Sequence, residues 1–250
     1  MAAPEPQAPA AAAYTPVVTD VLRLIRAPFN PRAVFEEQQD RPTFWMPWVV
    51  VSIVFAVLQI LQRPFQARLR ELIFEHLNRP APPASAGVGS IVIGIATGAA
   101  TVLVLAALSA SVCYLLLSVF GGETTFKKML TVSIFAWPIA LLGQVLTFVV
   151  LSMRGVAAIN SVWDLFVSFG SDLLLPADAQ LGAFSRIFLA GIGPLAIWQV
   201  VVTMIGLRVL GKASKGGAWA TAIIAFFILL AIAAGLGAFG MNAAIKAMGG

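Results

Sequence analysis

The stretch IVIGIATGAATVLVLAALSASVCYLLLSVF, residues 91–120, decides the fold of this chain. It lies inside a run of 43 residues between Arg79 and Glu123 that contains no Asp, Glu, Lys or Arg. A helix of about 20 apolar residues is long enough to cross a hydrocarbon core of ~30 Å. The stretch therefore predicts a membrane-spanning helix.

Four further charge-free stretches are about as long as a membrane span, and they are Phe44–Gln62, Met129–Met153, Ile187–Leu207 and Gly216–Ile245. Apolar residues make up 60% of the 250 residues and charged residues only 11%, whereas a soluble domain carries about 25% charged residues. We therefore predict an all-α, polytopic membrane helix bundle. Its five spans cover about 44–62, 90–119, 129–153, 187–209 and 218–241, within a membrane domain at 44–241.

The segments outside the spans differ in character. Residues 1–16 are rich in Ala and Pro and lack the basic start and apolar core of a cleavable signal peptide, so we expect a disordered tail. Residues 17–43 alternate apolar and charged positions at helical spacing, which predicts a short amphipathic helix at the cytoplasmic membrane surface. Pro28 should end this helix, and Pro31 should open another. Residues 242–250 form a short tail.

Two more surface helices are expected between the spans. Residues 63–79 place Phe65, Leu69 and Leu72 on one face and charged residues on much of the rest, which predicts an interfacial helix separate from span one. In the loop 154–183, the spacing of Ile159, Val162 and the following apolar residues suggests another.

Span two is long enough to exceed the hydrocarbon thickness, so we expect one tilted or protruding helix rather than a re-entrant pair. Gly94 and Gly98 form a GxxxG pair on this helix. Small residues let membrane helices approach closely. We expect this face to pack against another span of the same chain.

Residues that could perform chemistry are absent from the predicted spans. The sequence contains no HExxH, CxxC, P-loop or Ser/His/Asp arrangement, and its single histidine, His76, has no metal-ligating neighbour at ligand spacing. No carboxylate lies inside a span, although such a group marks most proton-coupled transporters. We therefore predict no enzyme, no cofactor, no metal site and no nucleic-acid partner.

Two spans carry helix-breaking residues. Pro138 lies in the middle of span three, and the sequence GIGP at 191–194 interrupts span four. Broken helices at matching depth form the substrate sites of many transporters, but Gly and Pro are also tolerated in membrane helices generally. Two interpretations stay open: a structural break, or a site for a small solute.

The orientation follows from the distribution of Lys and Arg, in a chain whose net charge is +5. With the N-terminus inside, the cytoplasmic segments hold nine Lys and Arg residues and the outer segments hold seven. The loop between spans three and four is acidic, and the turn between spans four and five is basic. Because cytoplasmic loops are enriched in Lys and Arg, we expect the N-terminus in the cytoplasm and the C-terminus outside.

Three parts of the chain together resemble the Yip domain family of five-span membrane proteins, which are named for interaction with Ypt/Rab GTPases. The first part is the segment with Pro28 and Phe35 before span one. The second is GGETTFKKMLTVSIFAWPIAL, and the third is IWQVVVTMIGLRVLGKASKGGAWA. The positions that carry the resemblance are Pro28, Phe35, Gly121, Gly122, Phe126, Trp137, Pro138, Pro194, Trp198, Gly211 and Lys215.

The resemblance implies five membrane helices and a cytosolic N-terminus. Eukaryotic members act in vesicle traffic with Rab GTPases, but the short Ala/Pro tail and the Ala- and Arg-rich composition look bacterial, so we do not carry that partner over. We expect a non-enzymatic protein of a bacterial inner membrane that contacts membrane lipids and a protein partner or a second copy. The alternative is a small-solute transporter or channel that uses spans three and four.

Overall fold

The computed structural model describes residues 16–80, 88–176 and 181–247. Within these ranges the chain is helical and contains no strand, which confirms the predicted all-α membrane fold. In chain order the elements are α1 (Pro16–Arg26), α2 (Pro31–Glu37), α3 (Trp45–His76), α4 (Val88–Val119), α5 (Phe126–Arg154), the 3₁₀ turns η1 (Val156–Ala158), η2 (Val162–Leu165) and η3 (Ser171–Leu174), α6 (Ala183–Ala190), α7 (Pro194–Leu210) and α8 (Lys215–Ala247).

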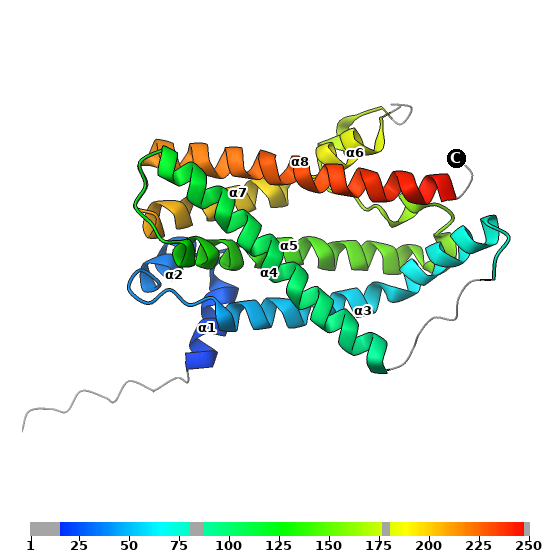
Figure 1. Cartoon of the computed structure of the whole chain (residues 1–250), viewed down its shortest axis with the longest axis horizontal. Coiled ribbons are helices and arrows are strands. Elements are labelled where there is room, and N and C mark those ends of the chain that lie inside the picture. The colour runs from blue at the N-terminus through cyan, green and yellow to red at the C-terminus, as the bar shows by residue number, and fades with distance from the viewer. Residues whose placement is uncertain (1–15, 81–87, 177–180, 248–250) are drawn as a thin grey trace, which may run out of the picture.

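The long helices form an elongated bundle with two distinct ends (Figure 1). At one end lie α1, α2, the end of α4 and the starts of α3, α5 and α8; we call this the α1–α2 end. At the other lie η1–η3 and the ends of α3, α5 and α8; we call this the η1–η3 end. Helices α3, α4, α5 and α8 are each long and apolar enough to span a membrane, and α6 with α7 makes a fifth span if the bent pair counts as one.

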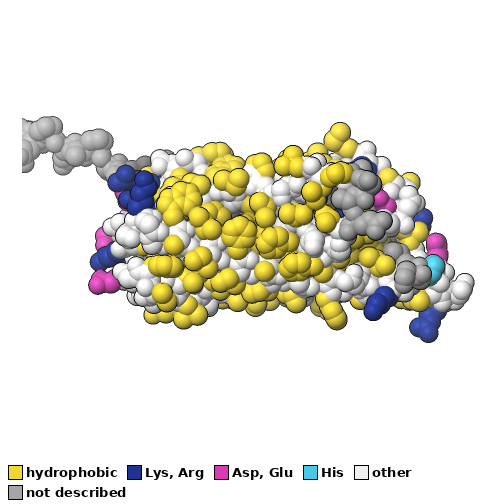
Figure 2. Space-filling model, turned by 90° about the horizontal axis from the view of Figure 1, so that it is seen from above, with side chains coloured by type: hydrophobic (Ala, Val, Ile, Leu, Met, Phe, Trp, Pro, Cys, Tyr) yellow, Lys and Arg dark blue, Asp and Glu magenta, His cyan; other side chains and the backbone are white. Residues whose placement is uncertain are grey.

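Charged side chains lie mainly at the two ends of the bundle. On the face shown in Figure 2, hydrophobic side chains cover the middle, and Lys, Arg, Asp and Glu gather on the left and right. Many large apolar side chains face outward along the helices, such as Leu115 at 65% and Phe239 at 78% exposure. Such a surface is stable when lipid rather than water surrounds it, because lipid chains contact apolar side chains without cost.

Helix α5 is the centre of the core. It packs against α3, α4 and α7, and every residue from Met129 to Ala136 is buried. A helix segment that is buried on all sides is expected to be apolar all round, and residues 129–136 are apolar apart from Thr131 and Ser133. The helix also continues through Pro138 without interruption. Of the two spans with helix-breaking residues, only span four is therefore broken.

The predicted separate interfacial helix at 63–79 is wrong, because α3 continues from span one through Pro64 to His76. A proline inside a helix removes one internal hydrogen bond, and membrane helices accommodate that loss. The 32 residues of α3 measure about 48 Å at 1.5 Å per residue. Its charged last turns therefore extend beyond a ~30 Å hydrocarbon core.

The surface helix predicted in the loop 154–183 is also wrong, because this loop forms the three short turns η1–η3. The carboxylate of Asp164 accepts hydrogen bonds from the backbone N–H of Asn160 at 2.9 Å, and from the N–H and hydroxyl of Ser161 at 2.8 and 3.0 Å. These local bonds compete with a continuous helix. The N–H of Asn160 contributes most to lowering the pKa of Asp164, and burial opposes it.

The remaining helices follow the expected ranges closely. Helix α4 is a single helix of 32 residues, as expected for a tilted span, and in Figure 1 it crosses α3 and α5 obliquely. Helix α1 ends at Arg26, and α2 opens at Pro31. The tail 1–16 falls almost entirely outside the described residues, and the C-terminal tail does so from residue 248.

Candidate functional site

The break in span four is the most irregular point of the membrane region. Helices α6 and α7 meet at an angle of 62° across Gly191–Gly193. Gly193 is extended and caps the start of α7, and Pro194 occupies its first turn. Proline suits this position because its missing N–H would be unpaired there anyway. The sequence GIGP thus divides the span into a short helix and a longer one.

The turn at residues 168–172 packs directly into this break. The backbone N–H of Ser171 donates to the carbonyl oxygen of Ile192 at 2.9 Å, and its hydroxyl donates to that of Leu189 at 2.9 Å. Ser168 and Asp172 form a short hydrogen bond that holds the turn closed. A β-carbon on Gly170 would lie 2.2 Å from the carbonyl oxygen of Ala190. Only a glycine fits at this distance.

The chain itself therefore satisfies the polar groups that the break exposes. The last carbonyls of a helix lack partners within the helix, and in broken transporter helices such groups coordinate the substrate or a coupling ion. Here the carbonyl oxygen of Leu189, in the last turn of α6, and that of Ile192, in the break itself, both accept hydrogen bonds from Ser171. Gly193 also lies against the loop, since a β-carbon there would be 2.4 Å from the Phe169 carbonyl oxygen. The break is occupied by protein.

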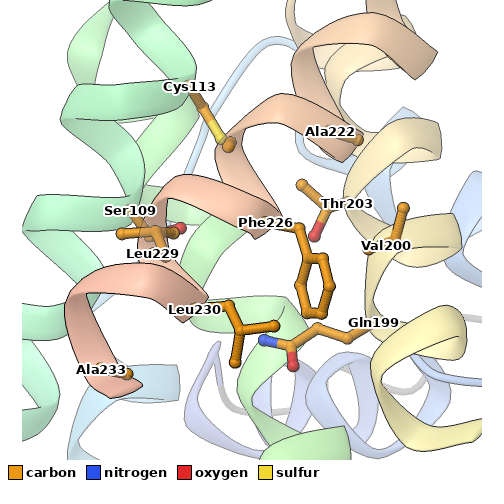
Figure 3. A pocket seen from close by; sticks show the side chains of 11 residues that line it. Ser109, Cys113, Gln199, Val200, Thr203, Ala222, Phe226, Leu229, Leu230 and Ala233 are labelled. Atoms are coloured by element: carbon orange, nitrogen blue, oxygen red, sulfur yellow. The ribbon is translucent and has the colours of Figure 1, made fainter. Parts of the chain in front are cut away.

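A cavity of about 230 Å³ lies nearby, beneath α8 and between α4 and α7 (Figure 3). Ser109 and Cys113 of α4 line it, together with Gln199 and Thr203 of α7. Each pair is spaced four residues apart, which places both members on one helix face. The rest of its wall is apolar and consists of Val200, Ala222, Ala225, Phe226, Leu229, Leu230 and Ala233.

Few of the groups that line this cavity could take part in catalysis. Its polar groups are two hydroxyls, one amide and one thiol, and none of its lining residues is a carboxylate, histidine, lysine or arginine. General acid–base catalysis needs a titratable group within hydrogen-bond reach of the substrate, and the one titratable side chain among these lining residues is the thiol of Cys113. The volume is below the ~300 Å³ at the lower end of typical ligand pockets. The cavity suits a small apolar group or part of a lipid chain.

The predicted family-motif residues of the N-terminal segment meet the fourth span. The indole Nε1–H of Trp198 donates to the carbonyl oxygen of Pro28 at 3.0 Å. Phe35 of α2 is fully buried, packs edge-on against Phe135 of α5 with ring centroids 6.2 Å apart, and lies against Gly206 of α7. Helix α2 is thereby wedged between α5 and α7.

The glycines of the two motif turns come together at the α1–α2 end. Gly121 has a φ of +77°, which a side chain would strain. A β-carbon on Gly122 would lie 2.4 Å from the Leu117 side chain, and one on Gly211 would lie 2.5 Å from the same side chain. Leu117 therefore fits into a hollow made by both turns, which joins the α4–α5 connection to the α7–α8 connection.

The other predicted positions are spread over the bundle. Trp137 packs edge-on against Phe55 with centroids 6.1 Å apart, Phe126 is exposed at the start of α5, and Lys215 is exposed at the start of α8. Gly94 and Gly98 both face α3, where Arg63 and Phe55 are their nearest neighbours. These positions lie at separate places in the bundle and do not form one site.

Sequence reasoning missed the residues that fill the break. Gly170 and Ser171 lie in a loop where no periodic pattern distinguishes them, and their role depends on a contact with the end of α6, farther along the chain. The i, i+4 spacing of Gln199 and Thr203 could have identified the polar face of α7. No local sequence pattern around Leu117 indicates that its side chain fits between the two glycine turns.

Comparison with known proteins gives the chain its family. The Yip1 domain family matches residues 25–236. The chain is similar to the membrane protein YknW of Bacillus subtilis (strain 168), with 32% identity over 212 residues that cover 80% of this chain and 84% of the relative. No solved structure matches this chain. With a domain match over most of its length and a bundle of long apolar helices, the chain belongs to the Yip1 domain family of integral membrane proteins.

Proposed function

We propose that this Yip1-domain protein is a non-enzymatic membrane scaffold, which acts through contacts with lipids and with a protein partner or a second copy. The observation that carries the proposal is the filled break in span four, where Ser171 occupies the carbonyls of Leu189 and Ile192. A solute site there would require these groups to be available. The same side chains and carbonyls instead hold the loop onto the bundle.

The outward face of α1 supports a role at the membrane surface. Val18, Leu22 and Ile25 recur at helical spacing and are 44%, 47% and 60% exposed. Arg23 on another face pairs with Glu37 of α2 at 2.7 Å, which ties α1 to the wedged helix. In Figure 1, α1 runs across the direction of the long helices. Such an amphipathic helix lies in the membrane interface.

The proposal also includes an orientation. The α1–α2 end carries nine Lys and Arg residues and the η1–η3 end carries seven. Since positive residues are enriched on the cytoplasmic side, the α1–α2 end faces the cytoplasm of a bacterial inner membrane. The end of α8 then lies on the outer side.

Transport is the second candidate function, because a broken span lies beside the cavity lined by Gln199 and Thr203. The two functions differ in liposomes that contain the purified protein. We expect entry of ions and small neutral solutes at the rate of protein-free liposomes, in wild type and in Pro194→Ala and Pro138→Ala alike. A saturable flux in wild type that either substitution reduces would overturn the scaffold proposal.

A further inference from the structure

A second cavity, of about 340 Å³, lies between α3 and α4 toward the η1–η3 end. We call it the α3–α4 groove. It differs from the cavity beneath α8 because it contains a charge. Its lining residues are Phe55, Ala56, Gln59, Ile60, Arg63 and Gln66 of α3 and Gly94, Thr97, Gly98 and Thr101 of α4. Arg63 is the one charged side chain among them.

Arg63 lies at the depth of lipid headgroups. It follows Trp45, the first residue of α3, by 18 positions, which corresponds to about 27 Å along a helix. A hydrocarbon core is ~30 Å thick, so Arg63 reaches the boundary of the core opposite the α1–α2 end. Two of the next three charged residues of α3, Arg68 and Glu71, pair with each other at 3.5 Å farther out. Arg63 lies deeper than this pair.

The small residues of α4 make room for the arginine. A β-carbon on Gly94 would lie 3.0 Å from the Nη2 atom of Arg63, so the guanidinium passes directly over this glycine. Gly94 and Thr97 are both exposed, whereas Gly98 is buried against Phe55. The groove therefore opens toward the surrounding lipid at Gly94 and Thr97 and closes at Gly98.

Polar groups continue from Arg63 along the groove. Gln59 and Gln66 lie four positions before and three positions after Arg63, on the same face of α3. Neither amide side chain forms a hydrogen bond within the described part of the chain. Gln59 lies one helical turn deeper than Arg63, where an unpaired polar group is costly. The amides of Gln59 and Gln66 thus offer donors to a ligand that arrives from the lipid.

We propose that the α3–α4 groove binds the phosphodiester headgroup of a phospholipid in the leaflet at the η1–η3 end. The Arg63 guanidinium donates to the phosphate oxygens, a pairing that its planar fork favours. The amides of Gln59 and Gln66 donate to the phosphate or to the ester carbonyls beside it. This inference deepens the lipid contacts of the proposed function and rests on them.

The test is native mass spectrometry of the delipidated, full-length protein titrated with phosphatidylglycerol. We expect wild type to retain one lipid molecule more firmly than the rest. Arg63→Gln should weaken this binding by roughly tenfold or more, the loss expected for a hydrogen bond to a charged group. Arg63→Lys keeps the charge and should retain part of the binding. The matched control is Arg70→Gln, which removes a charge from the same helix outside the groove and should bind like wild type.

Equal binding by wild type and Arg63→Gln would overturn the inference. If Arg63→Gln fails to fold, Gln59→Leu replaces it, with weaker binding expected and wild-type binding as the contradicting result. Millimolar inorganic phosphate should leave the bound lipid in place, and its displacement would refute a lipid source for the ligand. The flux assay tests the proposed function separately. If the protein transports solutes and its lipid binding depends on Arg63, only the scaffold proposal is refuted. If it does not transport and its lipid binding does not depend on Arg63, only the proposed headgroup site is refuted.

Discussion

Replacing Phe35 by alanine should lower the free energy of unfolding by about 3–5 kcal/mol, the range for removing a fully buried phenylalanine. Phe35 is 0% exposed and fills the space between Phe135 of α5 and Gly206 of α7. A β-carbon on Gly206 would lie 3.0 Å from the Phe35 ring, so the two helices are shaped around this side chain. Alanine would leave a cavity at the point where α2 is anchored.

The effect can be measured by unfolding the purified protein with a denaturing detergent and following tryptophan fluorescence. Trypsin should also cleave the variant more quickly after Arg26 and Arg32, because α1 and α2 lose their attachment. The control is Phe239→Ala on α8, where the ring is 78% exposed and faces outward. Equal destabilisation by the two substitutions would show that Phe35 is no anchor.

Replacing Gly170 by alanine, which adds a single methyl group, should cause the second largest loss of stability. The β-carbon of Gly170→Ala would lie 2.2 Å from the Ala190 carbonyl oxygen and 2.7 Å from its α-carbon. Backbone atoms cannot move aside as a side-chain tip can, so the turn at 168–172 must leave the break. We expect a loss of about 1–3 kcal/mol or more from this overpacking, together with the two hydrogen bonds of Ser171.

The matched control for Gly170→Ala is Gly182→Ala in the same region. A β-carbon on Gly182 meets nothing within 4 Å, and its φ of −63° suits any residue. The free energy of unfolding of this control should stay within about 0.5 kcal/mol of wild type, as is usual for surface changes. Full stability of Gly170→Ala would mean that the turn does not seal the break.

Composition and local pattern were enough to predict the spans and several helix starts. Long charge-free runs define the spans because only a closed helix satisfies its backbone in lipid. Pro31 and the GIGP motif marked real helix starts. The amphipathic pattern at 63–79 misled the expectation of a separate helix, because it belongs to the last turns of α3, which continue through Pro64 beyond the apolar span.

The tertiary contacts could not be predicted in this way. The position of Phe35 between two spans depends on Gly206, which is 171 residues away along the chain. The hydrogen bonds of Ser171 to Leu189 and Ile192 come from residues 168–172, which have no periodic pattern. The sequence predicted a surface helix earlier in the same loop because the apolar spacing at 159–167 is helical, but the hydrogen bonds of Asp164 stabilise a turn there instead.

The scaffold account depends most directly on whether water reaches the interior beside the broken span. Cys113 is the single cysteine of the chain, lines the cavity beneath α8 and is 2% exposed. Its accessibility to water can therefore be probed in permeabilised vesicles with a permanently charged, water-soluble thiol reagent. The positive control is Leu174→Cys in a Cys113→Ser background, because Leu174 is 87% exposed. We expect the control to react at once and Cys113 to react only after denaturation. Labelling of Cys113 in the folded protein would reveal an aqueous path and contradict the account.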